Sequence, residues 1–232
     1  MNLYIIVEGR RTEKKVYPAW FSYLIPRLRQ VKWPYQADLN NYFLFNGNGF
    51  PALLHNHLKN SIEEVNELEK FNYLVLVLDV DESTIDGRIN EVNEFLEENN
   101  LHLNTSTELI IIPQNRCIES WFLGNQKVFK QNPQSSDLIN YVQFYNVKTN
   151  DPEEMGIYPN FNTHSQFHSD YCTEFLRERN IRYSKNSPNG VVEKDYLDSL
   201  ILRNEETNHI KSFKLLVDFC KRVNFEIEFY NQ

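Results

Sequence analysis

The segment Tyr73–Asp81 reads YLVLVLDVD, and it decides the fold that the rest of the chain has to complete. Its first part, YLVLVL, is a continuous apolar run that has the length of a strand and is too short for a buried helix. Continuous apolar strands are typical of parallel sheets, because helices cover both faces of such a sheet. The run ends at Asp79 and Asp81. Ligands of parallel α/β sheets bind beyond the carboxyl ends of the strands, so these aspartates mark the edge where we expect a site.

Other short apolar runs in the first half of the chain alternate with stretches of helical periodicity. The expected strands are Leu3–Val7, Tyr42–Phe45 and Leu109–Ile112, and the expected helices are Thr12–Leu28, Leu53–Leu68, Ile85–Glu98 and Ile118–Phe129. Strands that alternate with amphipathic helices are typical of βαβ units. The pattern therefore predicts an α/β fold, with a mainly parallel sheet flanked by helices.

The pattern changes beyond Pro133 and becomes mostly helical. Helices are expected at Ser165–Arg179, Val192–Leu202 and Asn208–Arg222, and a late strand at Phe225–Tyr230. We therefore expect one α/β domain over residues 1–130 and a mostly helical C-terminal extension over residues 131–232 that packs on it.

The composition excludes several classes of protein. The 232 residues include 32 acidic and 24 basic side chains, for a net charge of −8, which excludes a polybasic nucleic-acid binder. A hydrophobic content of 41% suffices for a packed core. No apolar stretch approaches the roughly 20 residues that span a bilayer, and the N-terminus does not resemble a signal peptide. The three cysteines are far apart in the sequence, which favours reduced thiols over disulfides. A cytoplasmic protein with no membrane contact is expected.

Carboxylates follow three of the four expected strands. Glu8 follows the first, Asp79 and Asp81 follow the third, and Glu119 comes shortly after the fourth. Neighbouring carboxylates repel one another, so such a cluster is best explained by a divalent cation, and oxygen ligands suit Mg²⁺ or Mn²⁺. Each residue also has a structural explanation: Glu8 as a turn or cap residue, and Glu119 as an acid that complements a helix dipole.

The order of these motifs resembles the Toprim family. IIVEG at Ile5–Gly9 precedes LVLVLDVD at Leu74–Asp81, as the glutamate strand precedes the Asp-x-Asp strand in that family. VEGRRTE, which contains Glu13, and RCIESWFL at Arg116–Leu123 are similar to the stand-alone and OLD-type Toprim nucleases, including the RloB-like group. The resemblance covers residues 1–125. It implies a Toprim-like Rossmannoid sheet and a metal-dependent endonuclease.

The resemblance also implies roles for individual residues. Glu8 would bind metal or handle the proton near the scissile phosphate, Asp79 and Asp81 would hold Mg²⁺, and Glu13 and Glu119 would complete a second metal site. Two ions about 4 Å apart activate a water and stabilise the leaving 3′-oxygen. In a weaker match at Tyr183-Ser184-Lys185, Lys185 would neutralise charge on the phosphoryl oxygens; its alternative is an ordinary loop lysine.

Basic residues adjoin the first carboxylate. They are Arg10, Arg11, Lys14 and Lys15, and they either guide a phosphate backbone or form a solvated helix face. His164 and His168 are four residues apart, but no HExxH pattern accompanies them, so we do not assign them to zinc. Cys117 has no activating histidine in the sequence and reads as a small buried residue.

Two other functions compete with the nuclease. LVLVLDVDES at Leu74–Ser83 comes close to the haloacid-dehalogenase-like phosphatase signature, in which Asp79 would be phosphorylated and Asp81 would be the general acid. That motif normally occupies the first strand, and it would leave Glu8, Glu13 and Glu119 without a role. The second alternative is a non-catalytic Toprim docking subunit.

From the resemblance we expect a substrate of DNA or RNA, with tRNA possible, and a bacterial anti-phage defence or toxic effector. We also expect a partner ATPase that controls the activity, because OLD proteins carry an ATPase domain that this chain lacks. A homodimer is a further expectation from the resemblance.

Overall fold

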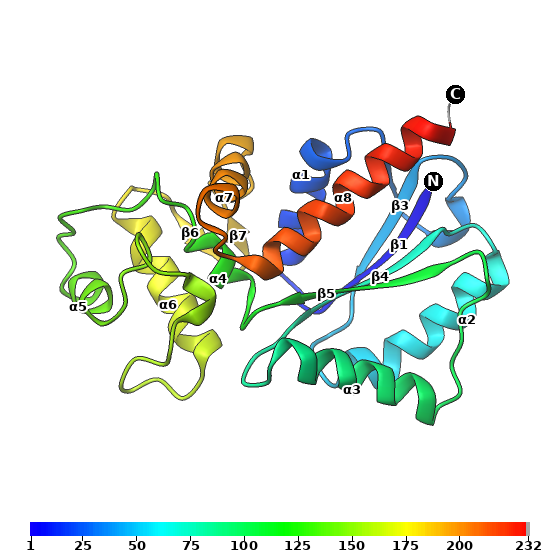
Figure 1. Cartoon of the computed structure of the whole chain (residues 1–232), viewed down its shortest axis with the longest axis horizontal. Coiled ribbons are helices and arrows are strands. Elements are labelled where there is room, and N and C mark those ends of the chain that lie inside the picture. Colours follow the sequence, from blue (N-terminus) through cyan, green and yellow to red (C-terminus); the bar gives the residue numbers. More distant parts are fainter. Residues whose placement is uncertain (231–232) are drawn as a thin grey trace. The chain divides into compact units, whose positions relative to one another are not determined.

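A computed structural model describes residues 1–230 of the chain, which divides into two compact units (Figure 1). Unit 1 contains Met1–Leu78, Ile85–Pro113 and the C-terminal stretch from Leu216. Unit 2 contains Asp79–Thr84 and Gln114–Leu215. The expected domains, 1–130 and 131–232, stay a prediction; the compact units begin and end at other residues.

The sheet of unit 1 confirms the predicted α/β fold. It has five parallel strands in the order β2-β3-β1-β4-β5. Their bounds are β1 Asn2–Val7, β2 Arg29–Val31, β3 Asn41–Asn46, β4 Tyr73–Asp79 and β5 Glu108–Gln114. The last residues of β4 and β5 belong to unit 2. β1 is central and buried along its whole length, which explains its continuous apolar sequence.

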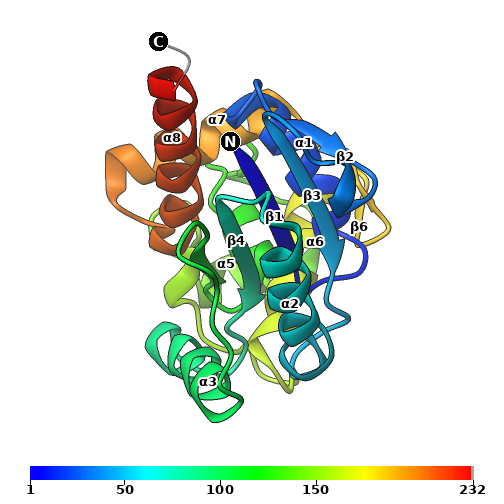
Figure 2. The same cartoon turned by 90° about the vertical axis from the view of Figure 1, so that its right-hand side faces the viewer.

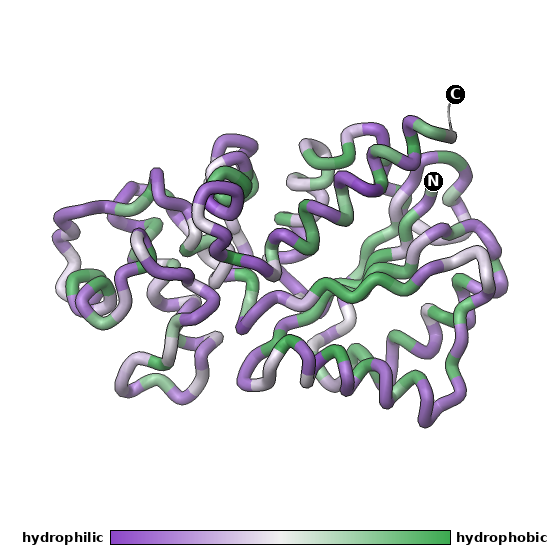
Figure 3. The backbone as a smooth tube through the Cα atoms, viewed as in Figure 1, coloured by the Kyte–Doolittle hydropathy of each residue, from purple (hydrophilic) through white to green (hydrophobic). Residues whose placement is uncertain are grey.

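Helices cover both faces of this sheet, as the apolar runs predicted (Figures 1 and 2). The helices of unit 1 are α1 Glu13–Leu24, α2 Lys59–Leu68 with a preceding π-helical turn Leu53–Leu58, α3 Ile85–Glu98, and the part of α8 from Leu216. Alternate residues of β4 face opposite helices: Leu74 and Leu76 join a core with α2 and α3, while the ring of Tyr73 lies 5.3 Å from that of Phe219 on α8. Figure 3 shows the strands as the most continuous apolar stretches.

Unit 2 is mostly helical and is organised around α6. Its elements are α4 Ile118–Phe122, α5 Ser136–Phe144, the short turn Pro152–Glu154, α6 His164–Arg177, the hairpin of β6 Tyr183–Ser184 and β7 Ser187–Pro188, α7 Lys194–Thr207 and the start of α8. The rings of Phe167, Tyr171 and Phe175 on α6 are buried. Ser135 and Thr163 accept hydrogen bonds as the N-caps of α5 and α6, which fixes where both helices begin.

Two secondary-structure predictions are corrected, and one helix was missed. The strand expected at Phe225–Tyr230 is wrong, because α8 runs as a helix from Lys211 to Tyr230. Its buried residues Phe219, Val223 and Ile227 recur every four positions, so the local alternation that suggested a strand is the end of a helical period. The helix expected over Ile118–Phe129 ends at Phe122, because Asn125 accepts the N–H groups of Lys127 and Val128 in a turn. Helix α5 was not predicted.

Among the described residues, no helix combines the length and the apolarity needed to cross a lipid bilayer.

Glu153 is a buried carboxyl in unit 2 whose ionisation opposes folding. Burial raises the pKa of Glu153 to about 7, although Trp121 and Ser212 donate hydrogen bonds to it. The folded state therefore favours the protonated form, and this stabilisation is full below the unfolded pKa of about 4.5 and is lost as the pH rises through 7.

We predict that Glu153→Gln becomes more stable relative to the wild type as the pH rises. Between pH values of about 4.5 and 7.5, the difference in unfolding free energy should change by about 3 kcal/mol in favour of the variant. Urea denaturation at both pH values measures it, and a difference that does not vary with pH would contradict the assignment.

The contribution of His168 to stability depends on pH in the opposite direction, so it serves as an internal control. Burial lowers the pKa of His168 to about 4, with its ring 2.8 Å from the hydroxyl of Ser120. Its stabilisation is present above the unfolded pKa of 6.5 and is lost as the pH falls towards 4. The Glu153→Gln variant should therefore lose stability in acid.

Candidate functional site

The loop after β4 is fixed to the loop after β5 within unit 2. The N–H of Val80 donates to the carbonyl of Gln114, and the N–H of Asp81 donates to the carbonyl of Arg116, both at 3.0 Å. Asp81 adopts the left-handed conformation with φ 50°, which turns the chain directly after the strand. This pairing extends the sheet register past the strand ends, so the residues after both strands are held in place.

Two side chains of unit 2 fix Asp81 and its loop. The guanidinium of Arg116 donates to the carbonyl oxygens of Asp81 at 2.8 Å and of Ser83 at 3.0 Å. The hydroxyl of Ser165, in the first turn of α6, donates to the Asp81 carboxylate at 2.9 Å. The orientation of Asp81 is therefore set by its own loop and by α6.

Asp79 and Glu119 lie near the same buried thiol. Burial raises the pKa of Cys117 well above its ordinary value, and the negative charges of Glu119 and Asp79 raise it further. Asp79 ends β4, and Glu119 lies in the first turn of α4, 2% exposed. The charges of two carboxylates from different elements therefore act on the same thiol. Cys117 stays protonated, so it is not a thiolate nucleophile.

The hairpin β6–β7 brings two polar side chains to Glu119. The hydroxyl of Tyr183 donates to Glu119 Oε1 at 2.9 Å, and the ammonium of Lys185 lies 3.9 Å from the same oxygen. The lysine side chain is 55% exposed, whereas Glu119 is buried. The hydroxyl of Tyr183 therefore orients the Glu119 carboxylate, which also faces the exposed ammonium of Lys185.

Glu8 and Glu13 lie in unit 1, at the end of β1 and the start of α1. Glu8 is 9% exposed; its N–H donates to the carbonyl of Val77, and its carboxylate accepts the N–H of Phe50, both at 3.0 Å. A side chain at Gly9 would overlap the carboxylate of Glu13. The VEG motif therefore uses glycine to leave room for a buried glutamate from the following helix.

The basic residues expected to bind nucleic acid are exposed in unit 1. Arg10 and Arg11 precede α1, and Lys14 and Lys15 lie in its first turn. Their neighbours Thr12 and Glu13 are buried, so the cations form the outer face of this helix start. The exposure fits either reading, a phosphate contact or a solvated face.

The histidines and the carboxylates are two sets of side chains that could bind a metal ion. His164 is held by Glu82 at 2.6 Å, whereas His168 donates from Nε2 to the carbonyl of Met155, and its Nδ1 lies 2.8 Å from the hydroxyl of Ser120. Over residues 1–230, no three His, Cys, Asp or Glu side chains are grouped to hold a metal ion. The five expected ligands therefore stay a prediction.

The donors around Cys117 nevertheless fit one hard cation. Mg²⁺ is commonly bound by one or two carboxylates, with waters and substrate phosphates completing its octahedron. Asp79 and Glu119 offer carboxylate oxygens, and the charges of both act on Cys117. Such oxygen ligands suit Mg²⁺ or Mn²⁺ better than a softer metal, and the Cys117 thiol stays protonated.

Sequence reasoning missed the residues that orient the carboxylates. Ser165 carries no motif, and its contact with Asp81 depends on where α6 begins. Tyr183 lies in the segment that was matched through Lys185, but the bond from its hydroxyl to Glu119 joins residues 64 positions apart. Only the resemblance of the Tyr183-Ser184-Lys185 segment to Toprim nucleases pointed to this part of the chain.

Comparisons with protein-family models, with curated proteins and with solved structures found no match.

We predict that Tyr183→Phe destabilises the chain by about 1–3 kcal/mol, because buried Glu119 then loses a hydrogen-bond donor. The phenylalanine keeps the ring contact with Phe122, whose centroid lies 5.8 Å away. Urea denaturation measures the loss. Tyr35→Phe, at a tyrosine that is 60% exposed, is the matched control, and equal effects of the two variants would contradict the role of the Tyr183 hydroxyl.

Proposed function

We propose that this protein is a Mg²⁺- or Mn²⁺-dependent endonuclease of the Toprim type, which hydrolyses phosphodiester bonds in DNA or RNA. One observation carries the proposal: Glu119, a buried carboxylate that accepts a hydrogen bond from Tyr183, faces the exposed ammonium of Lys185, and the charges of Glu119 and Asp79 both act on Cys117. An oriented carboxylate beside an exposed cation suits a reaction in which a phosphate is held near a metal ion.

The chain's own residues have separable tasks in this reaction. Asp79 and Glu119 would hold a divalent ion, which supplies positive charge and a water of lowered pKa when bound. Tyr183 fixes the Glu119 carboxylate, and Ser165 and Arg116 fix Asp81 and its loop. The Lys185 ammonium would bind a phosphoryl oxygen and stabilise the charge that develops there.

Further parts of the proposal rest on the Toprim resemblance alone. They are the metal or proton-transfer role of Glu8, the contribution of Glu13 to a second ion, and phosphate contacts by Arg10, Arg11, Lys14 and Lys15. The resemblance also supports the biological setting that we propose, an anti-phage defence or toxic effector that is controlled by a partner ATPase and active in the cytoplasm as a homodimer.

The central test is cleavage of nucleic acid. Purified protein is incubated with plasmid, single-stranded DNA and tRNA in Mg²⁺ or Mn²⁺, and the wild type should cut at least one of them. We predict that Asp79→Asn lowers the rate by about 10²-fold or more, because the amide no longer neutralises a cation. Asp198→Asn is the matched control, since Asp198 is exposed on α7 and bonds Lys194.

Two outcomes would replace the nuclease by its alternatives. Turnover of p-nitrophenyl phosphate that Asp79→Asn abolishes, with no cleavage of nucleic acid, indicates the phosphatase. Co-purification with a partner that persists when Asp79, Glu119 and Glu8 are all replaced, again without cleavage, indicates a docking subunit.

We predict that Gly9→Ala impairs cleavage more than stability. The added methyl group overlaps the Glu13 carboxylate, which is the far end of a flexible side chain and can shift. The free energy of unfolding should therefore fall by only about 1 kcal/mol, whereas the rate falls about tenfold if Glu13 serves the reaction. Gly156→Ala is the control, because a methyl group there meets no atom within 4 Å. Equal rates for both variants would remove Glu13 from the site.

A further inference from the structure

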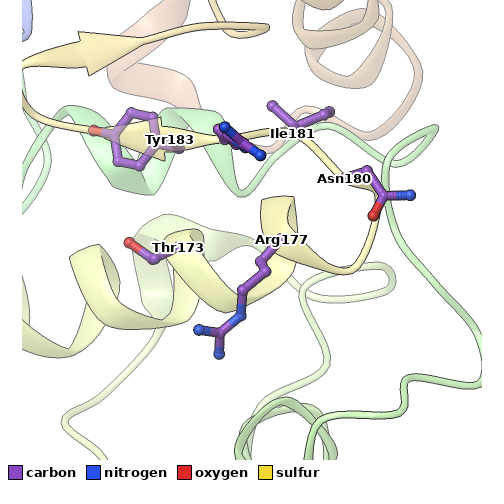
Figure 4. A pocket seen from close by; sticks show the side chains of 6 residues that line it. Thr173, Arg177, Asn180, Ile181 and Tyr183 are labelled. Carbon is purple, nitrogen blue, oxygen red and sulfur yellow. The ribbon is translucent and has the colours of Figure 1, made fainter.

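A pocket of about 460 Å³ opens beside the β6–β7 hairpin in unit 2 (Figure 4). Helix α6 contributes Thr173 and Arg177, and the segment that follows it lies across from them with Ile181 and Tyr183. The lining residues are Thr173, Arg177, Asn180, Ile181, Arg182 and Tyr183. The volume lies within the range of about 300–1,000 Å³ that is usual for ligand sites.

The pocket is basic in an acidic protein. Its lining has two arginines and no carboxylate, although the chain carries a net charge of −8. Arg177 pairs with Glu174 but is 63% exposed, and Arg182 is exposed and forms no ion pair within residues 1–230. The hydroxyl of Thr173 donates to the carbonyl of Ser169, so its oxygen remains able to accept a hydrogen bond. Such a lining favours an anionic ligand with polar groups.

A second pocket lies next to the first on α6. It has a volume of about 340 Å³, shares Thr173 with the first pocket and includes Ser165, Lys185 and one carboxylate, Asp170, which accepts a hydrogen bond from Tyr141. Each pocket therefore contains a residue that contacts a candidate catalytic carboxylate. Tyr183 and Lys185 lie at Glu119, and Ser165 bonds Asp81. A ligand that occupies both pockets is extended and contacts the residues that hold these carboxylates.

We propose that the two pockets bind one unpaired nucleic-acid strand, with backbone phosphates at Arg177 and Arg182 and the next phosphate at Lys185. This inference rests on the proposed nuclease function and names its substrate as a single-stranded segment. A pocket of this volume accepts one nucleotide at a time. Arginines that contact backbone phosphates bind the strand independently of its base sequence. The strand leaves the carboxylates along the side of α6.

The experiment measures binding without catalysis. Fluorescence anisotropy follows a labelled single strand of about 12 nucleotides, as DNA and as RNA, in EDTA and at salt concentrations from about 50 to 200 mM. Arg182→Glu should weaken binding about tenfold and reduce the slope of log K against log salt by about 0.7 for each phosphate that the variant no longer binds. Lys194→Ala, at an exposed lysine of α7 outside both pockets, should change affinity less than about twofold.

Folding and ligand type are checked in the same samples. Arg182 is exposed, so Arg182→Glu and Arg182→Ala should unfold at the wild-type temperature, and the alanine variant should show the smaller loss of affinity. Equal affinity of Arg182→Glu and the wild type overturns the proposal. So does displacement of the strand by free AMP at concentrations comparable to the strand, because the pocket then serves a mononucleotide.

The failure of this inference differs from the failure of the nuclease. If the protein binds single strands through Arg182 but cleaves no nucleic acid, the strand-binding proposal holds and the nuclease proposal fails. If Arg182→Glu cleaves with the same kcat/KM as the wild type, the nuclease proposal holds and the strand-binding proposal fails.

Discussion

The backbone pairing between the loops after β4 and β5 decides where the candidate catalytic groups lie. The backbone hydrogen bonds from Val80 to Gln114 and from Asp81 to Arg116 join the loop after β4 to the end of β5 and to the loop that follows it. Asp79 precedes this pairing, and Glu119 follows it in the first turn of α4. Because backbone bonds hold both segments, the side chains start from fixed positions, and Tyr183 then orients Glu119 while Ser165 orients Asp81.

The electrostatics of unit 2 separate a buried acidic group from exposed cations. Glu119 is buried and held by a hydroxyl, whereas Lys185, Arg177 and Arg182 are exposed. A carboxylate buried in this way is costly unless a partner neutralises it. This arrangement allows a protein with a net charge of −8 to present a local positive path to a phosphate backbone.

The strands and the positions of the carboxylates were predictable because their signal is local. The runs that became β1, β3, β4 and β5 are continuous and apolar, and helix α3 was predicted with its observed bounds. The edge strand β2 is exposed and has three residues, too few to show a pattern. In α8 the apolar and polar residues alternate over the last turns, and only packing decides between a strand and a helix there.

The site was predictable only as a set of residue types. The order of Glu8, Asp79, Asp81 and Glu119 along the chain predicted acids at strand ends. Contacts such as Tyr183 with Glu119 join distant segments and leave no mark in the sequence. The position of Arg116, with φ 68°, is likewise set by the loop that it closes.

The most direct test of the account is whether Asp79 and Glu119 together bind a divalent ion. Titration of the purified chain with Mn²⁺, followed by electron paramagnetic resonance, counts bound ions without any substrate. We predict that the wild type binds Mn²⁺ and that Asp79→Asn and Glu119→Gln each weaken this binding by about tenfold or more. Unchanged Mn²⁺ binding in both variants would contradict it.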